Sequence, residues 1–369
     1  MIRDTVRDFA QGVIAPKAAE IDKTGEFPAD IFAQMADLGL MGLPIAEEYG
    51  GADADYASYC LALEEITRAC GSTGLGYEAH ISLGCMPIYL FGSEEQKNTY
   101  LPRLCSGESM GSFGLTEPEA GSDAGGTQTT ARLEGGQWVI NGSKIYITNA
   151  SYAKFVTITA VTDKGTGTRG ISDIIVPTDT PGFKVTASFE KMGLHGSNTT
   201  ELYFDDVRVP EDNLVGKRGE GFKQFLVVLD GGRIAIGAMG VGIAQACLDA
   251  SLKYAKERVQ FGQPIGKFQA IQFKLADMAM NVELARNMYL KAAWLKDTGQ
   301  PYSQEANYAK LFGSEIATKA ALEAIQIHGG YGYIKEFPVE RYLRDAKLLE
   351  IGEGTSEIIR LVIARGLGL

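Results

Sequence analysis

Apolar residues recur at helical spacing through the first third of the chain. Ile2, Val6, Phe9 and Val13 lie three or four residues apart, so they would form one apolar face of a helix. After interruptions at prolines, the same periodicity predicts further helices over 31–38, 56–69 and 94–104, with a glycine-rich connection over 71–76. We therefore expect residues 1–110 to form an N-terminal α-helical domain.

The pattern changes near Gly111 to short runs of β-branched and aromatic residues separated by turn residues. Within 138–147, the pair Asn141-Gly142 stands between two such runs, which is a strong signal for a β-hairpin turn. Further strands are predicted over 155–161, 170–176, 183–185, 200–204 and 207–210. Because the turns are closely spaced, residues 111–213 are expected to form a middle β-barrel or sandwich domain.

From Gly216 the helical periodicity returns and continues to the C-terminus. Long helices are predicted over 218–257, 268–297 and 303–328. In the second of these, apolar residues alternate steps of four and three, as in an antiparallel bundle: Ile271, Leu275, Met278, Val282, Ala285, Tyr289 and Ala292. Residues 214–369 are therefore expected to form a C-terminal four-helix-bundle domain. The predicted fold is multidomain α+β, in the order helical, β, helical.

The composition is that of an ordinary soluble globular protein, with 45% hydrophobic and 22% charged residues among 369. A net charge of −11 argues against nucleic acid as the main partner, because phosphate binding needs a concentrated basic surface. The most apolar run, 234–248, contains three glycines and is short for a membrane span. We expect this run to be a buried helix, and we expect no membrane association.

Cysteine usage and the N-terminus bear on the compartment. Five cysteines at wide, irregular spacing indicate free thiols in a reducing compartment, and the three histidines show no metal-ligand spacing. The first residues, beginning at Met1, lack a hydrophobic signal core. The start at Met1 and the missing presequence favour a bacterial cytoplasmic protein over a processed matrix form.

The segment 165–170 matches the G-x-G-x-x-G fingerprint of dinucleotide-binding proteins. The residues that follow it, 171–176, predict a strand, whereas the phosphate-binding motif must open a helix. We therefore interpret this segment as a strand connection.

Near the C-terminus, Glu353 stands between Gly352 and Gly354 at a predicted junction of two helices. A helical run ends just before it, and the N-cap residue types at 355–356 open the next helix. Flanking glycines let the backbone approach a ligand closely, which suits a base that reaches into a pocket. From these residues alone, a solvated loop acid, or an acid favoured near a helix N-terminus, is the simpler interpretation.

A second informative stretch is 113–123, in which hydroxyl and acid side chains precede Gly121 and Ser122. Such a loop offers amide and hydroxyl donors to an anionic or heteroaromatic ligand. Tyr146 and Thr148 share one face of a strand, so a ring that can stack and a hydroxyl that can hydrogen-bond suit a planar cofactor. Taken alone, these residues fit a polar β-loop and ordinary cross-strand packing at least as well.

Five motifs occur together in a fixed order: Phe113-x-x-Thr-Glu-Pro-x-Ala-Gly-Ser-Asp123, Tyr146-Ile-Thr-Asn149, Glu257-Arg-x-x-Phe-Gly262, Gln326-Ile-His-Gly-Gly-Tyr-Gly332 and Glu353-Gly-Thr-Ser356. This set resembles the acyl-CoA dehydrogenase family. The resemblance covers essentially the whole chain and includes the helical, β, helical order.

The resemblance implies an enzyme that binds FAD non-covalently and forms a homotetramer. It also implies an acyl-CoA substrate and electron-transferring flavoprotein as the electron acceptor. Thr116 and Thr148 match residues that hydrogen-bond the flavin ring, and Tyr146 stands near the ring where many members have Trp.

Other positions match cofactor contacts of the family. Arg258 and Phe261 match the pair that meets FAD from a neighbouring subunit, with Gln269 near the same place. Gln326 and Gly330 match positions that line the FAD adenosine. The remaining implied cofactor contacts are Phe113, Leu115, Ser122, Thr355 and Glu357.

Glu353 matches the catalytic base of the family, which removes the α-proton of an acyl thioester while the β-hydrogen leaves as hydride to flavin N5. In the family, the backbone N–H of the base residue and a flavin ribityl hydroxyl stabilise the enolate oxygen. Because substrate binding expels water, we expect that in the complex burial raises the pKa of this carboxyl more than the adjacent helix N-terminus lowers it. The implied substrate contacts are Ser122, Asp230, Arg233, Gly352 and Gly354.

Two glycines separate this chain from other members. Some members carry the base on the first C-terminal helix, but the matching residue here, Gly232, has no side chain that could act as a base. A Tyr is common just before the base, and Gly352 leaves extra volume there. This predicts a branched, cyclic or aryl acyl group, or a pocket reshaped for a short one; bulky Tyr77 and Met86 in the expected pocket floor, 77–90, favour a short chain.

The expected function is therefore α,β-dehydrogenation of a short, branched or cyclic acyl-CoA. The alternatives on the same fold are an enoyl-CoA reductase and an acyl-CoA oxidase. A flavin-binding relative without this catalysis, including nucleic-acid-associated relatives, is an alternative of another class.

Overall fold

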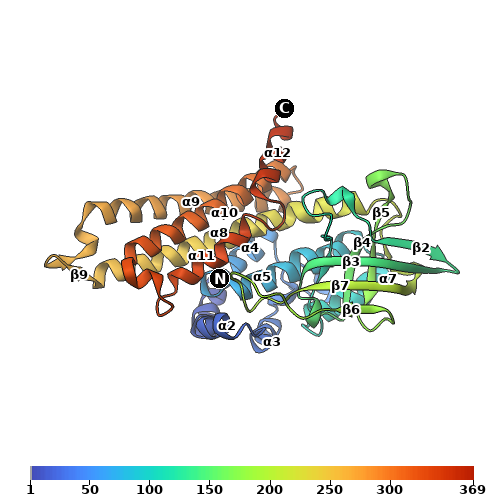
Figure 1. The fold of residues 1–369 in the computed structure, drawn as a ribbon, viewed down its shortest axis with the longest axis horizontal. Helices are drawn as coiled ribbons and strands as arrows, with labels where there is room; N and C mark the ends of the chain where they lie inside the picture. Colours follow the sequence, from blue (N-terminus) through green and yellow to red (C-terminus); the bar gives the residue numbers. More distant parts are fainter. Residues whose placement is uncertain (1) are drawn as a thin grey trace.

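A computed structural model describes residues 2–369 of the chain. The molecule is elongated: long helices form one end, and a β-sheet forms the other (Figure 1). One continuous core joins helices from the beginning and the end of the chain, and the sheet has a second core of its own. The order of elements is helical, β, helical, as predicted.

The N-terminal helices largely follow the predicted ranges. α4 spans Tyr56–Ala69, and α7 spans Glu94–Cys105, where Ser93 and Gln96 form a capping box. The other helical elements are α1 (Ile2–Phe9), a π-helical turn (Ala10–Ile14), α2 (Ala18–Thr24), α3 (Ala29–Asp37), α5 (Gly71–Glu78), a second π-helical turn (Ala79–Cys85) and α6 (Met86–Phe91).

The apolar face predicted for the first helix is only partly correct. Val6 is buried, but Ile2 is 37% exposed, and the buried face continues through Ala10 and Ile14. The reason is the π-helical turn Ala10–Ile14, which adds a residue to one turn and rotates the face that meets the core.

The glycine-rich segment 71–76 is not a connection, as expected, but the first part of α5. Its glycines allow close packing: a Cβ on Gly74 would lie 3.0 Å from the Cα of Thr67 on α4. Tertiary packing therefore outweighs the low helix propensity of glycine here.

The middle of the chain forms one eight-stranded sheet in the order β6-β7-β3-β2-β4-β5-β8, with β1 paired in parallel to β4. β2 and β4 join through a single residue pair, Thr130 and Val161, so the sheet consists of two halves. The strands are β1 (Phe113–Gly114), β2 (Thr130–Glu134), β3 (Gln137–Thr148), β4 (Phe155–Val161), β5 (Ile171–Pro177), β6 (Phe183–Val185), β7 (Thr199–Pro210) and β8 (Leu214–Val215).

The hairpin turn predicted at Asn141-Gly142 is wrong. These residues lie inside β3, at a shift of register against β7, and a Cβ on Gly142 would meet the Cα of Thr129 at 2.8 Å. The turn between β2 and β3 is made by Gly135 and Gly136, whose φ angles of +59° and +78° suit a tight hairpin. The ranges 200–204 and 207–210 are likewise parts of one strand, β7. The 165–170 segment leads into strand β5, as predicted.

Five helices make up the C-terminal part: α8 (Gly221–Glu257), α9 (Gln269–Asp297), α10 (Ser303–His328), α11 (Val339–Leu349) and α12 (Ser356–Gly366). A short hairpin of β9 (Val259–Gln260) and β10 (Gln263–Pro264) links α8 to α9. The predicted seam of α9 is confirmed from Met278 onward, because Met278, Val282, Ala285, Tyr289 and Ala292 are buried.

Helix α8 runs through the centre of the helical body. It is long and apolar enough to cross a membrane, but 78% of its most apolar window is buried inside the structure. The prediction of a buried helix over 234–248 is thus confirmed. All five cysteines are free and buried, as expected from their spacing.

Candidate active site

Glu353 lies in the turn between α11 and α12 and has a left-handed backbone conformation, with φ of +53°. Gly354 follows at φ of +103°, a conformation that residues with a side chain rarely adopt. The side chain of Thr355 then accepts a hydrogen bond from the amide of Ile358 and caps α12, as predicted. The sequence thus forces a sharp reversal at Glu353.

Two cationic side chains contact the backbone carbonyls of this turn. Lys310, on α10, donates a hydrogen bond from Nζ to the carbonyl of Gly354 at 2.6 Å. Arg233, on α8, places Nε 3.4 Å from the carbonyl of Glu353 and donates from Nη1 to Asp230 at 2.8 Å. Both cationic side chains are buried, so the position of the turn is set by the helical core.

The carboxylate of Glu353 is directed inward. Both of its oxygens are buried, and neither has a hydrogen-bond partner among residues 2–369. A Cβ on Gly232 would lie 2.6 Å from Oε1 and 2.7 Å from the carboxyl carbon, so only glycine fits at this point of α8. A buried acid without a partner is costly in a protein, and such acids are concentrated at functional sites.

A second carboxyl group, that of Glu78 at the end of α5, lies close enough to Glu353 that each shifts the pKa of the other. The side chain of Glu78 is buried and bonds to the hydroxyl of Ser82, which also donates to the Glu78 carbonyl at 2.9 Å. The π-helical turn Ala79–Cys85 begins directly after Glu78.

Burial dominates the electrostatics of the site. It raises the pKa of the Glu353 carboxyl to about 7, although Glu78, Arg233 and Lys310 act to lower it. Burial and the charge of Glu353 raise the pKa of Glu78 well above its usual range. Burial lowers the pKa of Lys310 to about 8, opposed by the charge of Glu353. A carboxyl with a pKa near 7 is suited to general base catalysis at neutral pH.

At the sheet, the structure brings together two of the predicted flavin contacts. The chain from Phe113 to Glu117 runs beside β3, because the amide of Ile145 donates to the carbonyl of Thr116 at 2.8 Å. The hydroxyl of Ser112 donates to the carbonyl of Thr148 at 2.7 Å. The hydroxyls of Thr116 and Thr148 are partly exposed and have no hydrogen-bond partner among the described residues. They are free to bind a ligand.

A buried ion pair supports this edge. Lys144 on β3 donates from Nζ to Glu117 at 2.6 Å, to the carbonyl of Leu115 at 3.1 Å and to Thr159 at 3.0 Å. Glu117 in turn accepts from the amide of Gln128 at 2.7 Å. This network fixes the segment that carries Thr116.

Tyr146 has a left-handed backbone conformation, with φ of +61°, at a shift of register in β3, and it is exposed, while Ile147 is buried and Thr148 is partly buried. The ring of Tyr146 is 64% exposed and lies 5.6 Å from the ring of Phe189. Ser122 is exposed in the loop after β1, whereas Phe113 is buried and Leu115 is partly buried. The last two side chains therefore support the loop.

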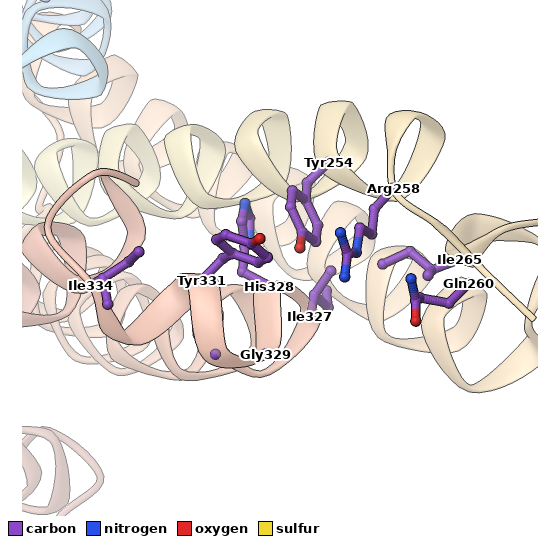
Figure 2. Close-up of a pocket in the computed structure, with 10 residues that line it drawn as sticks. Tyr254, Arg258, Gln260, Ile265, Ile327, His328, Gly329, Tyr331 and Ile334 are labelled. Atoms are coloured by element: carbon purple, nitrogen blue, oxygen red, sulfur yellow. The ribbon is translucent and has the colours of Figure 1, made fainter.

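The predicted residues Arg258 and Gly330 line one hollow of about 470 Å³ near the C-terminal end of α8 (Figure 2). The guanidinium of Arg258 lies 5.3 Å from the ring centre of Tyr331. A side chain at Gly330 would meet nothing within 4 Å, so the hollow is open there. The other lining residues are Tyr254, Gln260, Ile265, Ile327, His328, Gly329 and Ile334.

Several predicted cofactor residues lie outside this hollow. Phe261, at the β9–β10 turn, is 93% exposed, and Gln269 is exposed at the first turn of α9. Gln326 is exposed in the last turn of α10, and Glu357 is exposed at the start of α12. The β9 hairpin and the sheet lie at opposite ends of the molecule (Figure 1). Within one chain, the predicted cofactor residues at the sheet and those near the β9 hairpin therefore form two separate groups.

Two groups at the site were not predicted from the sequence: Glu78 and Lys310. Glu78 falls within the expected pocket floor, 77–90, and an acid inside this largely apolar run is a signal that could have been used. Lys310 interrupts a helix face between buried Ala306, Ala309 and Gly313. An ionisable residue on a buried face is the corresponding signal there.

Comparison with protein-family models matches most of the chain in three parts. Residues 1–108 match the acyl-CoA dehydrogenase N-terminal domain, 112–207 the middle domain and 219–368 the C-terminal domain. A probable acyl-CoA dehydrogenase of Bacillus subtilis strain 168, YngJ, is 64% identical over 368 residues, covering 100% of this chain and 97% of that protein.

Solved structures give the same result. Butyryl-CoA dehydrogenase from Megasphaera elsdenii has a TM-score of 0.98 at 43% identity, covering 100% of this chain and 97% of that chain. A chain from a structure described as the electron transferring flavoprotein of Acidaminococcus fermentans also has a TM-score of 0.98, at 47% identity and the same coverage.

Proposed function

The chain belongs to the acyl-CoA dehydrogenase family, and on that premise we propose that it oxidises a short, branched or cyclic acyl-CoA to the 2-enoyl-CoA, with Glu353 as the base. The observation that carries this proposal is the carboxylate of Glu353, which is buried and has no partner among residues 2–369. An acid kept in this state is available to a substrate.

The residues around Glu353 support proton abstraction. The base must be ionised to accept the α-proton, and its pKa of about 7 leaves a substantial ionised fraction at neutral pH. Arg233 and Lys310 stabilise the turn and favour the ionised state by their charge. No acceptor among the described residues meets the amide of Glu353, which leaves that N–H available to the thioester oxygen as negative charge develops there.

The cofactor is FAD, which would accept the hydride from the β-carbon. The residues at the sheet fit it: Thr116 and Thr148 present unpaired hydroxyls beside the exposed ring of Tyr146. A hydrogen-bonding edge next to an aromatic face suits a flat, polar ring system.

We also propose a homotetramer, because one chain does not bring its cofactor residues together. The β9 strand, which directly follows Arg258, lies at the opposite end of the molecule from the sheet whose strand β3 ends at Thr148 (Figure 1). A second copy that presents its Arg258 hollow to this sheet would join the two groups. Exposed apolar side chains on α9 and its neighbouring hairpin are available for such contacts: Phe261, Phe273, Met280 and Leu284.

The proposed acyl group is short, branched or cyclic. Tyr77 is fully buried and its hydroxyl donates to the carbonyl of Leu40 at 2.9 Å, so this ring forms a fixed wall. Gly352 leaves space next to the base, since a Cβ there would meet only Leu348, at 3.6 Å.

Electron-transferring flavoprotein is the proposed electron acceptor. The cytoplasm is the proposed compartment, which is consistent with five free thiols.

An anaerobic screen of the purified protein tests this proposal. Short, branched, cyclic and dicarboxylic acyl-CoAs are added one at a time, and loss of the oxidised flavin absorbance is followed. Bleaching by short, branched or cyclic acyl-CoAs is the expected result. Absence of bleaching with every acyl-CoA would overturn the proposal in favour of a flavin-binding protein. Reoxidation by enoyl-CoA much faster than by electron-transferring flavoprotein would favour a reductase, and fast reoxidation by O₂ would favour an oxidase.

A further inference from the structure

Asp345 on α11 is a buried acid to which the proposed function assigns no role. Its carboxylate accepts a hydrogen bond from the amide of Leu194 at 2.6 Å. Leu194 lies between β6 and β7 and has a left-handed backbone conformation, with φ of +53°, which is uncommon for a residue other than glycine. The other carboxylate oxygen lies against the first residue of α5, since a Cβ on Gly71 would come within 2.9 Å of it. One side chain therefore joins α11, α5 and the β6–β7 connection.

The β6–β7 connection is packed directly onto the backbone of α11. A Cβ on Gly193 would lie 2.4 Å from the carbonyl carbon of Arg344, so only glycine fits there. The guanidinium of Arg344 also binds the carboxylate of Asp22 on α2, with two hydrogen bonds of 2.7 and 2.8 Å. The connection therefore cannot shift against α11 without moving the helix.

The C-terminal end of α11 carries the turn of the proposed base. The helix ends at Leu349, and the amide of Gly352 donates to the carbonyl of Leu348 at 2.9 Å. The amide of Ser356 donates to the carbonyl of Glu350, also at 2.9 Å. These two bonds tie the turn around position 353 to the helix, so the position of α11 determines the position of the base.

The two segments that meet Asp345 also reach the flavin edge proposed at Thr148. Asn149, the next residue, is fully buried, and its backbone amide donates to the carbonyl of Asn198 at 3.1 Å. Its side-chain amide donates to the carbonyl of Gly76 at 2.9 Å. Asn198 belongs to the β6–β7 connection and Gly76 belongs to α5. Asp345 and Asn149 are therefore linked twice, once through each segment.

We propose that Asp345 is a positioning residue that holds α11 at a fixed distance from the sheet, so that Glu353 and the flavin edge at Thr148 face one substrate together. The inference rests on the proposed function, in which the α-hydrogen leaves as a proton to Glu353 and the β-hydrogen leaves as a hydride to FAD. Such transfers need the reacting groups held within about 0.5 Å of the productive geometry. Asp345 acts through α11 and not through contact with the reacting atoms.

Two substitutions at position 345 separate this role from simple packing. Asp345→Leu removes the acceptor for the amide of Leu194, whereas Asp345→Asn keeps an oxygen there. Anaerobic bleaching of each holoenzyme by the best acyl-CoA of the screen is followed by stopped flow at increasing substrate concentration. In Asp345→Leu the rate at saturating substrate should fall about 100-fold, while the flavin content and the half-saturating concentration stay close to those of the parent. Asp345→Asn should recover most of this loss.

Asp205→Leu, which removes an exposed acid of β7, is the matched control and should match the parent. A parent-like rate in Asp345→Leu, or equal losses in the Leu and Asn variants, would overturn the inference. An Asp345→Leu enzyme that bleaches at the parent rate at saturation, but needs more substrate, would also overturn it, because the residue would then support substrate binding alone.

Gly71→Ala tests the same contact if Asp345→Leu does not fold with bound flavin. The added Cβ would lie 2.9 Å from the carboxylate of Asp345 and displace it, whereas a Cβ at Gly12 meets nothing within 4 Å. Bleaching at saturating substrate should be about ten-fold slower in Gly71→Ala than in Gly12→Ala. Equal rates in these two variants would overturn the inference.

Amide hydrogen exchange of the substrate-free holoenzyme tests the link without turnover. In Gly71→Ala and Asp345→Leu, peptides that cover 191–198 and 350–356 should exchange faster than in the parent, because both segments lose a shared anchor. Peptides from α9 should not change. Faster exchange over 191–198 with no change over 350–356 would overturn the inference. Because this measurement needs no substrate, a failure of the proposed function would be recognised separately, as absence of bleaching in the parent.

Discussion

Gly232 on α8 lies directly against the carboxylate of Glu353, so that a Cβ at position 232 would come within 2.6 Å of Oε1 and 2.7 Å of the carboxyl carbon. Some family members carry the base at the position of Gly232. Here the side chain of Glu353, which comes from the α11–α12 turn, occupies the space that a side chain at position 232 would need. One site cannot hold both. Gly232 therefore has two consequences: it leaves room for the carboxylate of Glu353, and it removes the alternative base.

Gly232→Ala should therefore displace the base while leaving the fold intact. Displacements of about 1 Å at a reacting group cost about 100-fold in rate, so kcat/KM should fall by about that factor. Alanine is also the better helix former, by about 1 kcal/mol, so Tm should change little. Gly12→Ala is the matched control, because a Cβ at Gly12 meets nothing within 4 Å. Equal activity in the two variants would contradict the proposed geometry.

The pH dependence of the reaction should report the ionisation of Glu353. The carboxylate is the active form, and its pKa in the substrate-free protein is raised to about 7 by burial. Thus kcat/KM should increase about ten-fold per pH unit well below pH 7 and level off above it. Measurement over pH 5.5 to 9 checks this; a rate that is flat down to about pH 5, near the usual range of a glutamate, would show that the base is not this buried group.

Lys310→Met should loosen the turn that carries the base. The substitution removes the hydrogen bond to the carbonyl of Gly354, and a charged hydrogen bond of this kind contributes about 1.5–3 kcal/mol. Lost entirely from the transition state, that amount corresponds to about a 10- to 100-fold decrease in kcat/KM. Lys319→Met, at an exposed position of the same helix, is the control and should retain activity. A Lys310→Met enzyme as active as this control would rule out the supporting role.

Gly352→Tyr should narrow the pocket without disturbing the backbone. A Cβ at this position makes only an ordinary contact with Leu348, at 3.6 Å. Turnover of a branched acyl-CoA should fall at least about ten-fold relative to butyryl-CoA in the same variant, as expected for a change of one or two methylene volumes. If both substrates slow equally, Gly352 does not determine the shape of the pocket.

The sequence was most informative where periodicity was long and regular. The bounds predicted for α4 and α10 match the structure, since each helix buries one regular face in the common core. The Asn141-Gly142 prediction failed because Gly142 is needed for the close approach of Thr129, a tertiary constraint with the same local signature as a turn. The turn is instead made by Gly135 and Gly136, both of which have positive φ angles.

For the site, ordered motifs identified Glu353, but they could not show what surrounds it. Glu78 lies 275 positions away in the chain, and Lys310 forms its bond through a backbone carbonyl, which leaves no side-chain signature at Gly354. Such contacts depend on how α5, α8 and α10 pack together. The two separate groups of cofactor residues are likewise a property of the folded chain, which a linear order of motifs does not reveal.

The most direct test compares the parent with Glu353→Gln, both purified with bound flavin and mixed anaerobically with the acyl-CoA that bleaches the parent best. Glutamine has nearly the shape of glutamate but cannot act as a base. The flavin content should be equal in the two proteins, and acyl-CoA should bleach the parent flavin while leaving that of Glu353→Gln oxidised. Bleaching of the Glu353→Gln flavin at the parent rate would contradict the assignment of Glu353 as the base.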